Sequence, residues 1–340
     1  MAHAPRITLK DVAALAGVSI KTASRALAGE PGVNVQTLAT IKSAAEKLDY
    51  RPNRLAQQLR GGHATHAMAL LIGELHNPFY SEVAAGVESV LRPHGFDIFI
   101  ASTNEDVDTE KHLIENFIER SVEGIFILPA SQDHFYLENE RRRGTPIVFL
   151  DRPPVNVLAD SVTLDNRKAT RDAIAYLFNE GHENIAVLAD AENVWTARER
   201  ITGVRDAYNG KKIQINESLI INGVTAPDAI LETLTQLLAL PKDRAPTAIL
   251  ALNNQITIGV ISALQKLKKP LGLVGFDDFD LAEVLSTTVV RHSPFELGRQ
   301  GALLALDRLE NPNRKPSHIV MQAELVDRGS VFAIKQKDSQ

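Results

Sequence analysis

The first fifty residues place apolar side chains at helical spacing, with no strand-like alternation among them. A first helix is expected to begin at Thr8, to bury Val12, Leu15 and Ala16, and to end at Gly17, whose freedom to adopt positive φ terminates helices. The pattern therefore opens with a short amphipathic helix and a tight turn.

Two more helices follow in the same segment. Ser19 is a good cap for a helix over residues 20–27 that buries Ala23 and Leu27 and stops at the Gly29 to Pro31 turn. A third helix is predicted over residues 35–48, with Leu38, Ile41, Ala45 and Leu48 on one face. Residues 1–50 thus predict an all-α head.

Beyond the head, buried-strand runs alternate with helix-length amphipathic segments. The predicted strands are residues 67–72, 97–102, 124–129, 145–150, 184–189, 247–252 and 271–276. Alternation on this scale is typical of parallel sheets with helices on both faces, and we expect the sheet to split in two. The fold class is therefore an all-α head joined to an α/β body.

Composition and charge narrow the function. The 340 residues contain no cysteine, which excludes disulfides, thiol nucleophiles and Cys-ligated zinc fingers. No apolar run approaches the roughly 18 residues of a membrane span, and the first residues do not read as an export signal, so a cytoplasmic location is expected. Residues 1–62 hold nine Lys/Arg and four Asp/Glu, while the rest of the chain holds 28 and 38. A basic head on an acidic body suggests a nucleic-acid contact in the head.

The spacing in residues 9–27 is that of a helix-turn-helix, with small Ala13 where two helices cross and Gly17 in the turn. The second helix would expose Ile20, Lys21, Thr22, Ser24 and Arg25 to base edges in a major groove. The alternative is a three-helix bundle with a solvated polar face. Residues 53–60, NRLAQQLR, are too short for a stable helix alone and predict a conditional element, with residues 61–65 as linker.

Enzyme readings lack a motif. The chain has no HExxH, P-loop, GxGxxG after a strand or GxSxG elbow, and its ten histidines are scattered without metal-ligand spacing. We therefore expect a protein that is not an enzyme, with no cofactor and no metal site. An α/β enzyme acting on a sugar or nucleotide stays open as an alternative that turnover of candidate sugars would support.

These segments resemble the LacI (lac repressor) family. The resemblance rests on LKDVAALAGVSIKTASRAL from residue 9, YRPNRLAQQL from 50, HNPFYSEVAAGVE from 76, FLDRP from 149, TARERITGV from 196, VGFDD from 274 and ELVDRGS from 324. It implies a body of the type I periplasmic-binding-protein fold, in which three crossovers join two doubly wound parallel-sheet subdomains around a ligand cleft. The chain departs from the family pattern at Ala23 and Ala28, where Val and Asn are usual.

The resemblance also implies a domain plan. It comprises a DNA-binding domain at 1–50, a hinge helix and linker at 51–62, an effector-binding and dimerisation domain at 63–333, and a polar tail at 334–340. The N-subdomain would span about 63–160 and 292–322, and the C-subdomain about 161–291 and 323–333. The implied DNA contacts are Thr8, Ser19, Ile20, Lys21, Thr22, Ser24, Arg25, Asn53, Arg54, Ala56 and Leu59. Leu59 would wedge into the minor groove; alternatively it packs on the body.

Effector contacts can be carried over by position. Asn77 and Phe79 follow the first strand of the body, and Asn253 follows a later one, where ligands of such sheets bind. Arg200 and Asp277 match a clamp on ligand hydroxyls, although mutual ion pairing is the simpler reading. A further pair of candidates, Arg152 and Trp195, is open to two readings each: Arg152 is either a cleft ligand or a subdomain salt bridge, and Trp195 is either an aromatic lid or ordinary packing. Asn253 is followed by Asn254 where the family has Asp.

The sequence thus predicts a dimeric repressor that binds a pseudopalindromic operator and responds to a sugar-like effector. The alternative from another class is a solute-binding protein for sugar uptake. The missing export signal and the basic head oppose that alternative.

Overall fold

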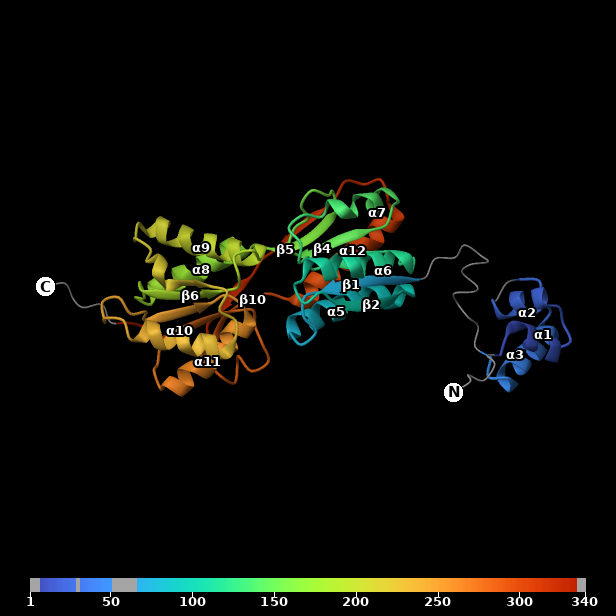
Figure 1. Cartoon of the computed structure of the whole chain (residues 1–340), viewed down its shortest axis with the longest axis horizontal. Helices are drawn as coiled ribbons and strands as arrows, with labels where there is room; N and C mark the ends of the chain where they lie inside the picture. The colour runs from blue at the N-terminus through green and yellow to red at the C-terminus, as the bar shows by residue number, and fades with distance from the viewer. Residues whose placement is uncertain (1–6, 29–30, 51–65, 335–340) are drawn as a thin grey trace. The chain divides into compact units, whose positions relative to one another are not determined.

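The computed structural model describes residues 7–28, 31–50 and 66–334. The chain divides into two compact units, Met1–Thr65 and His66–Gln340 (Figure 1). The predicted hinge helix at 53–60 and the tail beyond residue 334 lie outside the described residues.

The described part of the head, residues 7–28 and 31–50, contains three helices, as predicted. Its helices are α1 (Leu9–Leu15), α2 (Ile20–Leu27) and α3 (Val35–Lys47). Its core is built from small and β-branched side chains, namely Val12, Ala13, Ala23, Ala26, Ile41, Ala44 and Ala45. Alanines at the crossing points let the helix backbones approach closely, which explains why so short a segment can form a core.

The prediction that Leu15 belongs to the core of the head is wrong. Leu15 is 53% exposed, whereas Val12 and Ala13 are buried. The stripe that packs on the core runs through Leu9, Val12, Ala13 and Ala16, at the i, i+3, i+4, i+7 spacing of one helix face. Leu15 lies beside that stripe.

The body contains two six-stranded sheets. The first, in the order β11-β5-β4-β3-β1-β2, is parallel throughout. The second, in the order β12-β10-β9-β8-β6-β7, is parallel except for β12, which pairs antiparallel to β10. The strands are β1 (Ala67–Ile72), β2 (Asp97–Ser102), β3 (Ile125–Ile127), β4 (Ile147–Asp151), β5 (Asp160–Leu164), β6 (Ile185–Ala189), β7 (Ile220–Asn222), β8 (Ala248–Ala251), β9 (Gly272–Phe276), β10 (Thr288–Arg291), β11 (His318–Met321) and β12 (Glu324–Val326).

Helices cover both faces of each sheet, which confirms the predicted α/β fold class (Figure 1). In the first subdomain, which contains the first sheet, α5 (Pro78–Leu91) and α12 (Pro294–Glu310) pack on one face and α6 (Val107–Glu119) packs on the other. The short helix α7 (Glu138–Arg142) buries no side chain of its own. In the second subdomain α8 (Asn166–Asn179) and α9 (Trp195–Lys211) lie opposite α10 (Pro227–Leu238) and α11 (Asn254–Leu267). Short 3-10 turns occupy Arg92–His94, Phe135–Leu137 and Glu217–Leu219.

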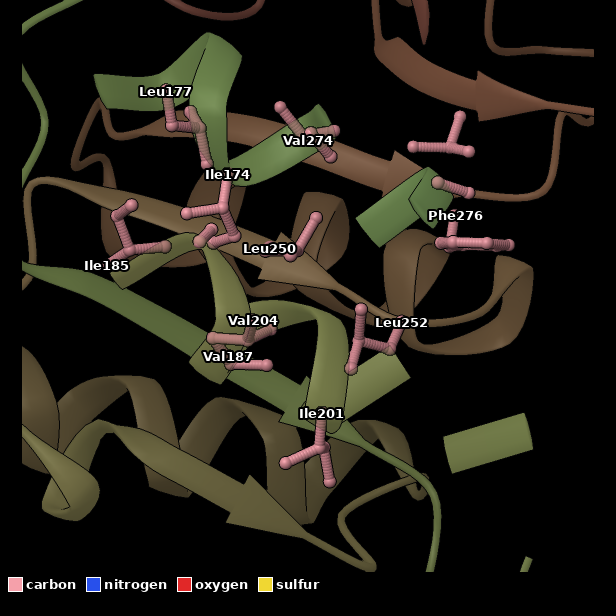
Figure 2. Packing of buried hydrophobic residues seen from close by; sticks show 14 of the residues in the cluster. Ile174, Leu177, Ile185, Val187, Ile201, Val204, Leu250, Leu252, Val274 and Phe276 are labelled. Atoms are coloured by element: carbon pink, nitrogen blue, oxygen red, sulfur yellow. The ribbon is translucent and has the colours of Figure 1, made fainter. Parts of the chain in front are cut away.

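Aliphatic side chains fill the layers between helices and sheets. Figure 2 shows the layer under α8 and α9, where Ile174 and Leu177 of α8 meet Val187, Leu250 and Val274 of three adjacent strands. All five are essentially inaccessible to solvent. Burial of such side chains is worth about 1.5–3 kcal/mol each, so this layer fixes the sheet on which the cleft residues stand.

Three crossovers join the two subdomains, at Asp165, at His292 to Ser293, and at Gln322 to Ala323. The backbone N–H of Asp165 donates to the carbonyl of Met321 at 2.9 Å, which ties the first crossover to the third. Because β5 belongs to the first sheet, that subdomain extends to Leu164 and passes the boundary expected at about residue 160.

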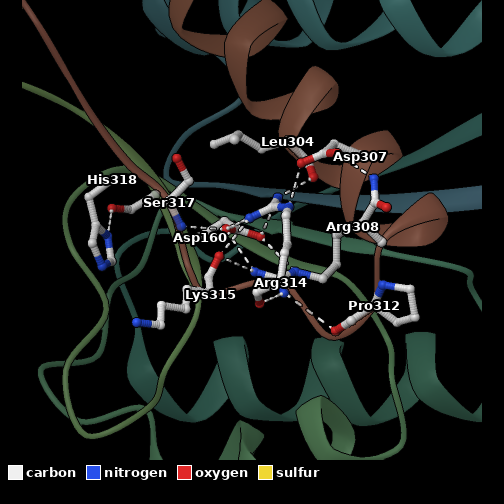
Figure 3. Close-up of polar contacts among 11 residues, drawn as sticks. Asp160, Leu304, Asp307, Arg308, Pro312, Arg314, Lys315, Ser317 and His318 are labelled. Atoms are coloured by element: carbon white, nitrogen blue, oxygen red, sulfur yellow. Dashed lines mark hydrogen bonds and ion pairs between the residues drawn. The ribbon is translucent and has the colours of Figure 1, made fainter.

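Strand β5 begins with a buried carboxylate that three distant donors hold in place (Figure 3). Asp160 is 1% exposed. Its oxygens accept hydrogen bonds from the guanidinium groups of Arg308 and Arg314 and from the Ser317 N–H, over 2.7–3.1 Å. A buried charge requires such partners, and here they pin α12 and the segment before β11 to the start of β5.

Candidate functional site

The head presents the polar face of α2. The Ser19 hydroxyl accepts a hydrogen bond from the Thr22 N–H at 3.1 Å and so caps the helix, and Gly17 holds the preceding turn at a φ of 66°. Ile20 and Lys21 are exposed, whereas Thr22, Ser24 and Arg25 are partly buried. The predicted second helix therefore turns its first residues outward, as readout of base edges requires.

Arg25 and Thr8 already have partners within the head. A guanidinium nitrogen of Arg25 donates to the Pro31 carbonyl at 2.6 Å. The backbone N–H and hydroxyl of Thr8 donate to the Asp11 carboxylate at 2.8 and 2.7 Å, and these hydrogen bonds lower the pKa of Asp11. Thr8 thus fixes the start of α1. Four further predicted contacts, Asn53, Arg54, Ala56 and Leu59, lie outside the described residues.

A polar cleft of about 140 Å³ lies between the two subdomains, at the carboxyl ends of their strands. The structure brings together six of the seven predicted effector contacts on its walls, namely Asn77, Phe79, Arg152, Arg200, Asn253 and Asp277. Trp195 is not among the residues that line the cleft, although its neighbours Val194 and Thr196 are. Trp195 begins α9, and adjacent residues of a helix project about 100° apart, so the chain turns it away from the lining positions.

Asn77 connects the two walls. Its side-chain oxygen caps α5 by accepting from the Phe79 N–H at 3.1 Å, and it also accepts from the Asn254 amide of the second subdomain at 2.9 Å. Gln255 donates to Glu74 at 3.0 Å, and Gln132 donates to the Asn193 carbonyl at 3.0 Å. Asn254, where the family pattern has Asp, therefore acts as a donor across the cleft.

Arg152 lines the cleft and is also ion-paired. Its guanidinium donates to both carboxylate oxygens of Glu105 at 2.6 and 2.9 Å and to the Pro129 carbonyl at 2.6 Å. Burial acts to lower the pKa of Arg152, but Glu105 more than offsets it and raises that pKa above its usual value. The salt bridge stays within the first subdomain, so it does not join the two.

Arg200 is positioned by contacts on several sides. It donates to the Asn166 side chain at 2.7 Å and to the Leu252 carbonyl at 2.5 Å, and it stacks 3.6 Å from the centre of the Phe276 ring. Its distance to the Asp277 carboxylate is 3.8 Å, a long ion pair. This distance is too long for a hydrogen bond, so both groups keep capacity to bond a ligand hydroxyl.

Asp277 is a buried carboxylate that stays ionised. Its oxygen lies 3.0 Å from Nε2 of the buried His292 at the second crossover. Burial acts to raise the pKa of Asp277, but Arg200 and His292 together outweigh burial and lower it. An ionised carboxylate at this position can accept hydrogen bonds from ligand hydroxyls.

The structure adds carboxylates that the sequence argument did not single out. Asp151 ends β4, Asp190 follows β6, and both line the cleft. The Asn253 amide donates to both oxygens of Asp190 at 2.9 and 2.8 Å, while its carbonyl caps α11 by accepting from the Ile256 N–H. The strand-end rule that selected Asn77 would also have found Asp151 and Asp190.

Among the described residues, no group of three or more His, Asp or Glu side chains could hold a metal ion. No described helix is long and apolar enough to cross a bilayer.

Two family models match the chain. Residues 8–53 match "Bacterial regulatory proteins, lacI family", and residues 65–277 match "Periplasmic binding proteins and sugar binding domain of LacI family". The HTH-type transcriptional repressor CytR of Escherichia coli (strain K12) is 28% identical over 333 residues, which cover 96% of this chain and 97% of the relative.

Solved structures agree in fold. The complex of the transcriptional regulator CelR with cellobiose is 27% identical, with a TM-score of 0.69 over 96% of this chain and all of that one. The lac repressor dimer bound to operator and the anti-inducer ONPF has a TM-score of 0.80 over 96% of this chain and all of that one, at 24% identity. That second likeness bears on the fold alone.

Proposed function

Because this chain belongs to the LacI family of bacterial regulatory proteins, we propose that two copies of it bind a pseudopalindromic operator and repress transcription, and that a small polyhydroxylated ligand controls their affinity for the operator. The chain is a DNA-binding transcription regulator. One observation carries this function: a capped recognition helix and a polar two-walled cleft occur in a single chain, each within the matched part of the family.

The proposed division of labour follows the two units. Residues 1–50 read the operator, residues 51–62 form the hinge with Leu59 as minor-groove wedge, residues 63–333 bind the effector and dimerise, and residues 334–340 are a polar tail. We place this activity in the cytoplasm, where the chromosome of a bacterium lies. The protein acts by binding, without turnover of its ligand.

An apolar face on the first subdomain supports dimerisation. The edge strand β2 and the neighbouring α5 form a groove of about 680 Å³, and the side chains of Leu75, Phe99 and Ile100 are exposed there. Exposed apolar grooves of this kind mark interaction surfaces. A second copy of the chain would cover this groove and pair the heads for two half-sites about 10 base pairs apart.

The cleft supports a sugar or polyol as effector. Phe79 offers an aromatic ring against which a sugar ring can pack. The Arg200 guanidinium can donate hydrogen bonds to vicinal hydroxyls, and the Asp277 carboxylate can accept hydrogen bonds from them. For such a ligand to control DNA binding, it must bind one arrangement of the subdomains better than another.

Selection from random duplexes by the full-length chain tests the proposal. We expect enrichment of a twofold-symmetric site, and a change in operator affinity when the correct sugar is added. Equal binding to all duplexes, with and without a sugar panel, would disprove the function.

A further inference from the structure

The cleft carries an excess of negative charge. Five carboxylates and two guanidinium groups line it: Glu74, Glu105, Asp151, Asp190 and Asp277 against Arg152 and Arg200. Glu105 has a close cationic partner, because Arg152 pairs with it at 2.6 Å. Asp277 lies 3.0 Å from Nε2 of His292 and 3.8 Å from Arg200.

Asp190 and Asp151 remain under-compensated. The amide of Asn253 orients Asp190 by donating to both of its oxygens, but an amide brings no charge. Asp151 is 8% exposed, and its ion pair with Arg152 is long, at 3.7 Å, because that guanidinium directs its shorter hydrogen bonds to Glu105. Burial raises the pKa of both carboxyl groups. The Asn253 hydrogen bonds offset only part of this effect at Asp190, and Arg152 offsets only part of it at Asp151.

Hydrogen-bond donors from a ligand would supply what these groups lack. Hydroxyl groups donate to carboxylates and bring no charge of their own, whereas a phosphate or carboxylate on the ligand would add a like charge inside a small cleft. Asp190 faces the cleft from the second subdomain and Asp151 from the first, so a bound polyol would be held from both walls.

We propose that Asp190, held in position by Asn253, is a specificity-determining residue that accepts hydrogen bonds from the hydroxyls of an uncharged polyhydroxylated ligand and excludes phosphorylated and acidic sugars from the cleft. This inference rests on the proposed function, since it takes the cleft as the effector site. Asn253 acts as a positioning residue, because both ends of its amide are engaged by Asp190 and by the start of α11.

Matched neutral and anionic sugars test the charge rule on the full-length protein. The probes are ribose with ribose 5-phosphate, and glucose with glucose 6-phosphate and glucuronate. Thermal shift and the fluorescence of Trp195, the single tryptophan, report binding. We expect a neutral sugar to bind and its anionic partner to bind about a hundredfold more weakly or not at all.

The variant Asp190→Asn keeps the side-chain shape and removes the charge. We expect it to weaken binding of the neutral sugar about tenfold, which is the scale of a charge-assisted hydrogen bond. The difference in affinity between the neutral sugar and its anionic partner should decrease by a similar factor. Asp228→Asn is the matched control, because it removes one exposed charge from α10 of the same subdomain, outside the cleft lining. It should bind both sugars as the unaltered protein does.

Three results would overturn the inference: an anionic sugar that binds as tightly as its neutral partner, no binding of any neutral sugar, or Asp190→Asn behaving like the control. Operator selection is measured on the same preparations. A protein that selects an operator but prefers an anionic sugar refutes this inference alone, whereas loss of operator selection refutes the proposed function.

Discussion

Asp151 and Asp277 occupy matching positions in the two subdomains, yet their surroundings have opposite effects. Asp151 ends β4 and Asp277 directly follows β9, and both adopt left-handed backbone, with φ of 68° and 66°. Burial raises the pKa of Asp151, while Arg200 and His292 outweigh burial and lower the pKa of Asp277. Asparagine tolerates the same backbone, so it can remove each charge without new strain.

Opposite pH dependences follow for the two asparagine variants. At pH 7 Asp151→Asn should raise the melting temperature, because the ionised carboxylate destabilises the fold, and this gain should shrink as pH falls through the raised pKa. Asp277→Asn should lower the melting temperature at pH 7, and this loss should shrink only as pH falls below about 4, the ordinary carboxyl range. Each pKa unit corresponds to about 1.4 kcal/mol, or a few degrees in a domain of this size.

Melting curves between pH 3 and 8 check both signs. A shift in the same direction for the two variants at pH 7 would show that the surroundings of the two carboxylates do not differ as described.

Arg25 is the residue of α2 best suited to read guanine. Arg25→Ala should reduce the discrimination between bases at one base pair of each half-site. The expected loss is about 1–3 kcal/mol, the value of a bidentate contact. Lys42→Ala, at an exposed position of α3, removes the same charge from the head and should weaken all duplexes alike. Affinities for single-base-pair operator variants distinguish the two. A uniform loss with Arg25→Ala would assign that arginine to the phosphate backbone.

At the scale of elements, α5 and α12 approach each other through two glycines. A Cβ added at Gly86 would lie 1.9 Å from the Phe295 carbonyl oxygen, and one at Gly298 would lie 2.0 Å from that of Val83. Backbone atoms cannot move aside as a flexible side chain can. These two helices cover one face of the first sheet, and Asn77 and Arg152 follow strands of that sheet.

Gly298→Ala should therefore force the helices apart and destabilise the body by about 3 kcal/mol or more. Gly210→Ala is its control, since α9 leaves open space around Gly210 and alanine is the better helix former by up to about 1 kcal/mol. Urea unfolding followed by circular dichroism measures both. Equal midpoints for the two variants would show that the helix contact can relax.

Elements with a local signature were predictable, and those that depend on distant partners were not. The apolar runs of β1, β2 and β9 matched their predicted ranges to within a residue. Strand β5, DSVTL, was missed because its polar start becomes acceptable only when Arg308 and Arg314, about 150 residues later, pair with Asp160. Strand β7 has only three residues, which gives no measurable period.

The same distinction holds for the cleft. Residues that follow a strand could be placed there by topology alone, and six of the named contacts do line it. Which of them contacts a ligand depends on pairing: Glu105 engages Arg152 and Asp190 engages Asn253, over 47 and 63 positions in the chain. Sequence spacing carries no record of such pairs.

For the whole molecule, ligand control requires that the two subdomains act as one unit on the DNA-bound pair of heads. The hydrogen bonds that Asn254 and Gln255 make to Asn77 and Glu74 join the walls of the cleft. In the proposed regulator, a ligand that favours this arrangement changes operator affinity, and the operator changes ligand affinity by the same factor. Pairing of two chains would convert a shift of the subdomains into a change in the spacing of the two heads.

Opposite edges of the first sheet provide a test of that pairing, because β2 and β11 are its two edge strands. Phe99 on β2 is 41% exposed beside an apolar groove, and Val320 on β11 is 55% exposed.

A charge at Phe99 would have to be buried without a partner if a second copy covers this edge, so Phe99→Glu should yield monomers in sedimentation velocity. Operator affinity should then fall by about a hundredfold or more, since each head loses the effective concentration that its partner provides, while sugar binding in the cleft persists. Val320→Glu places the same charge at the other edge and should leave the dimer and its operator affinity intact. Dimers of Phe99→Glu with unchanged affinity would move the interface away from β2.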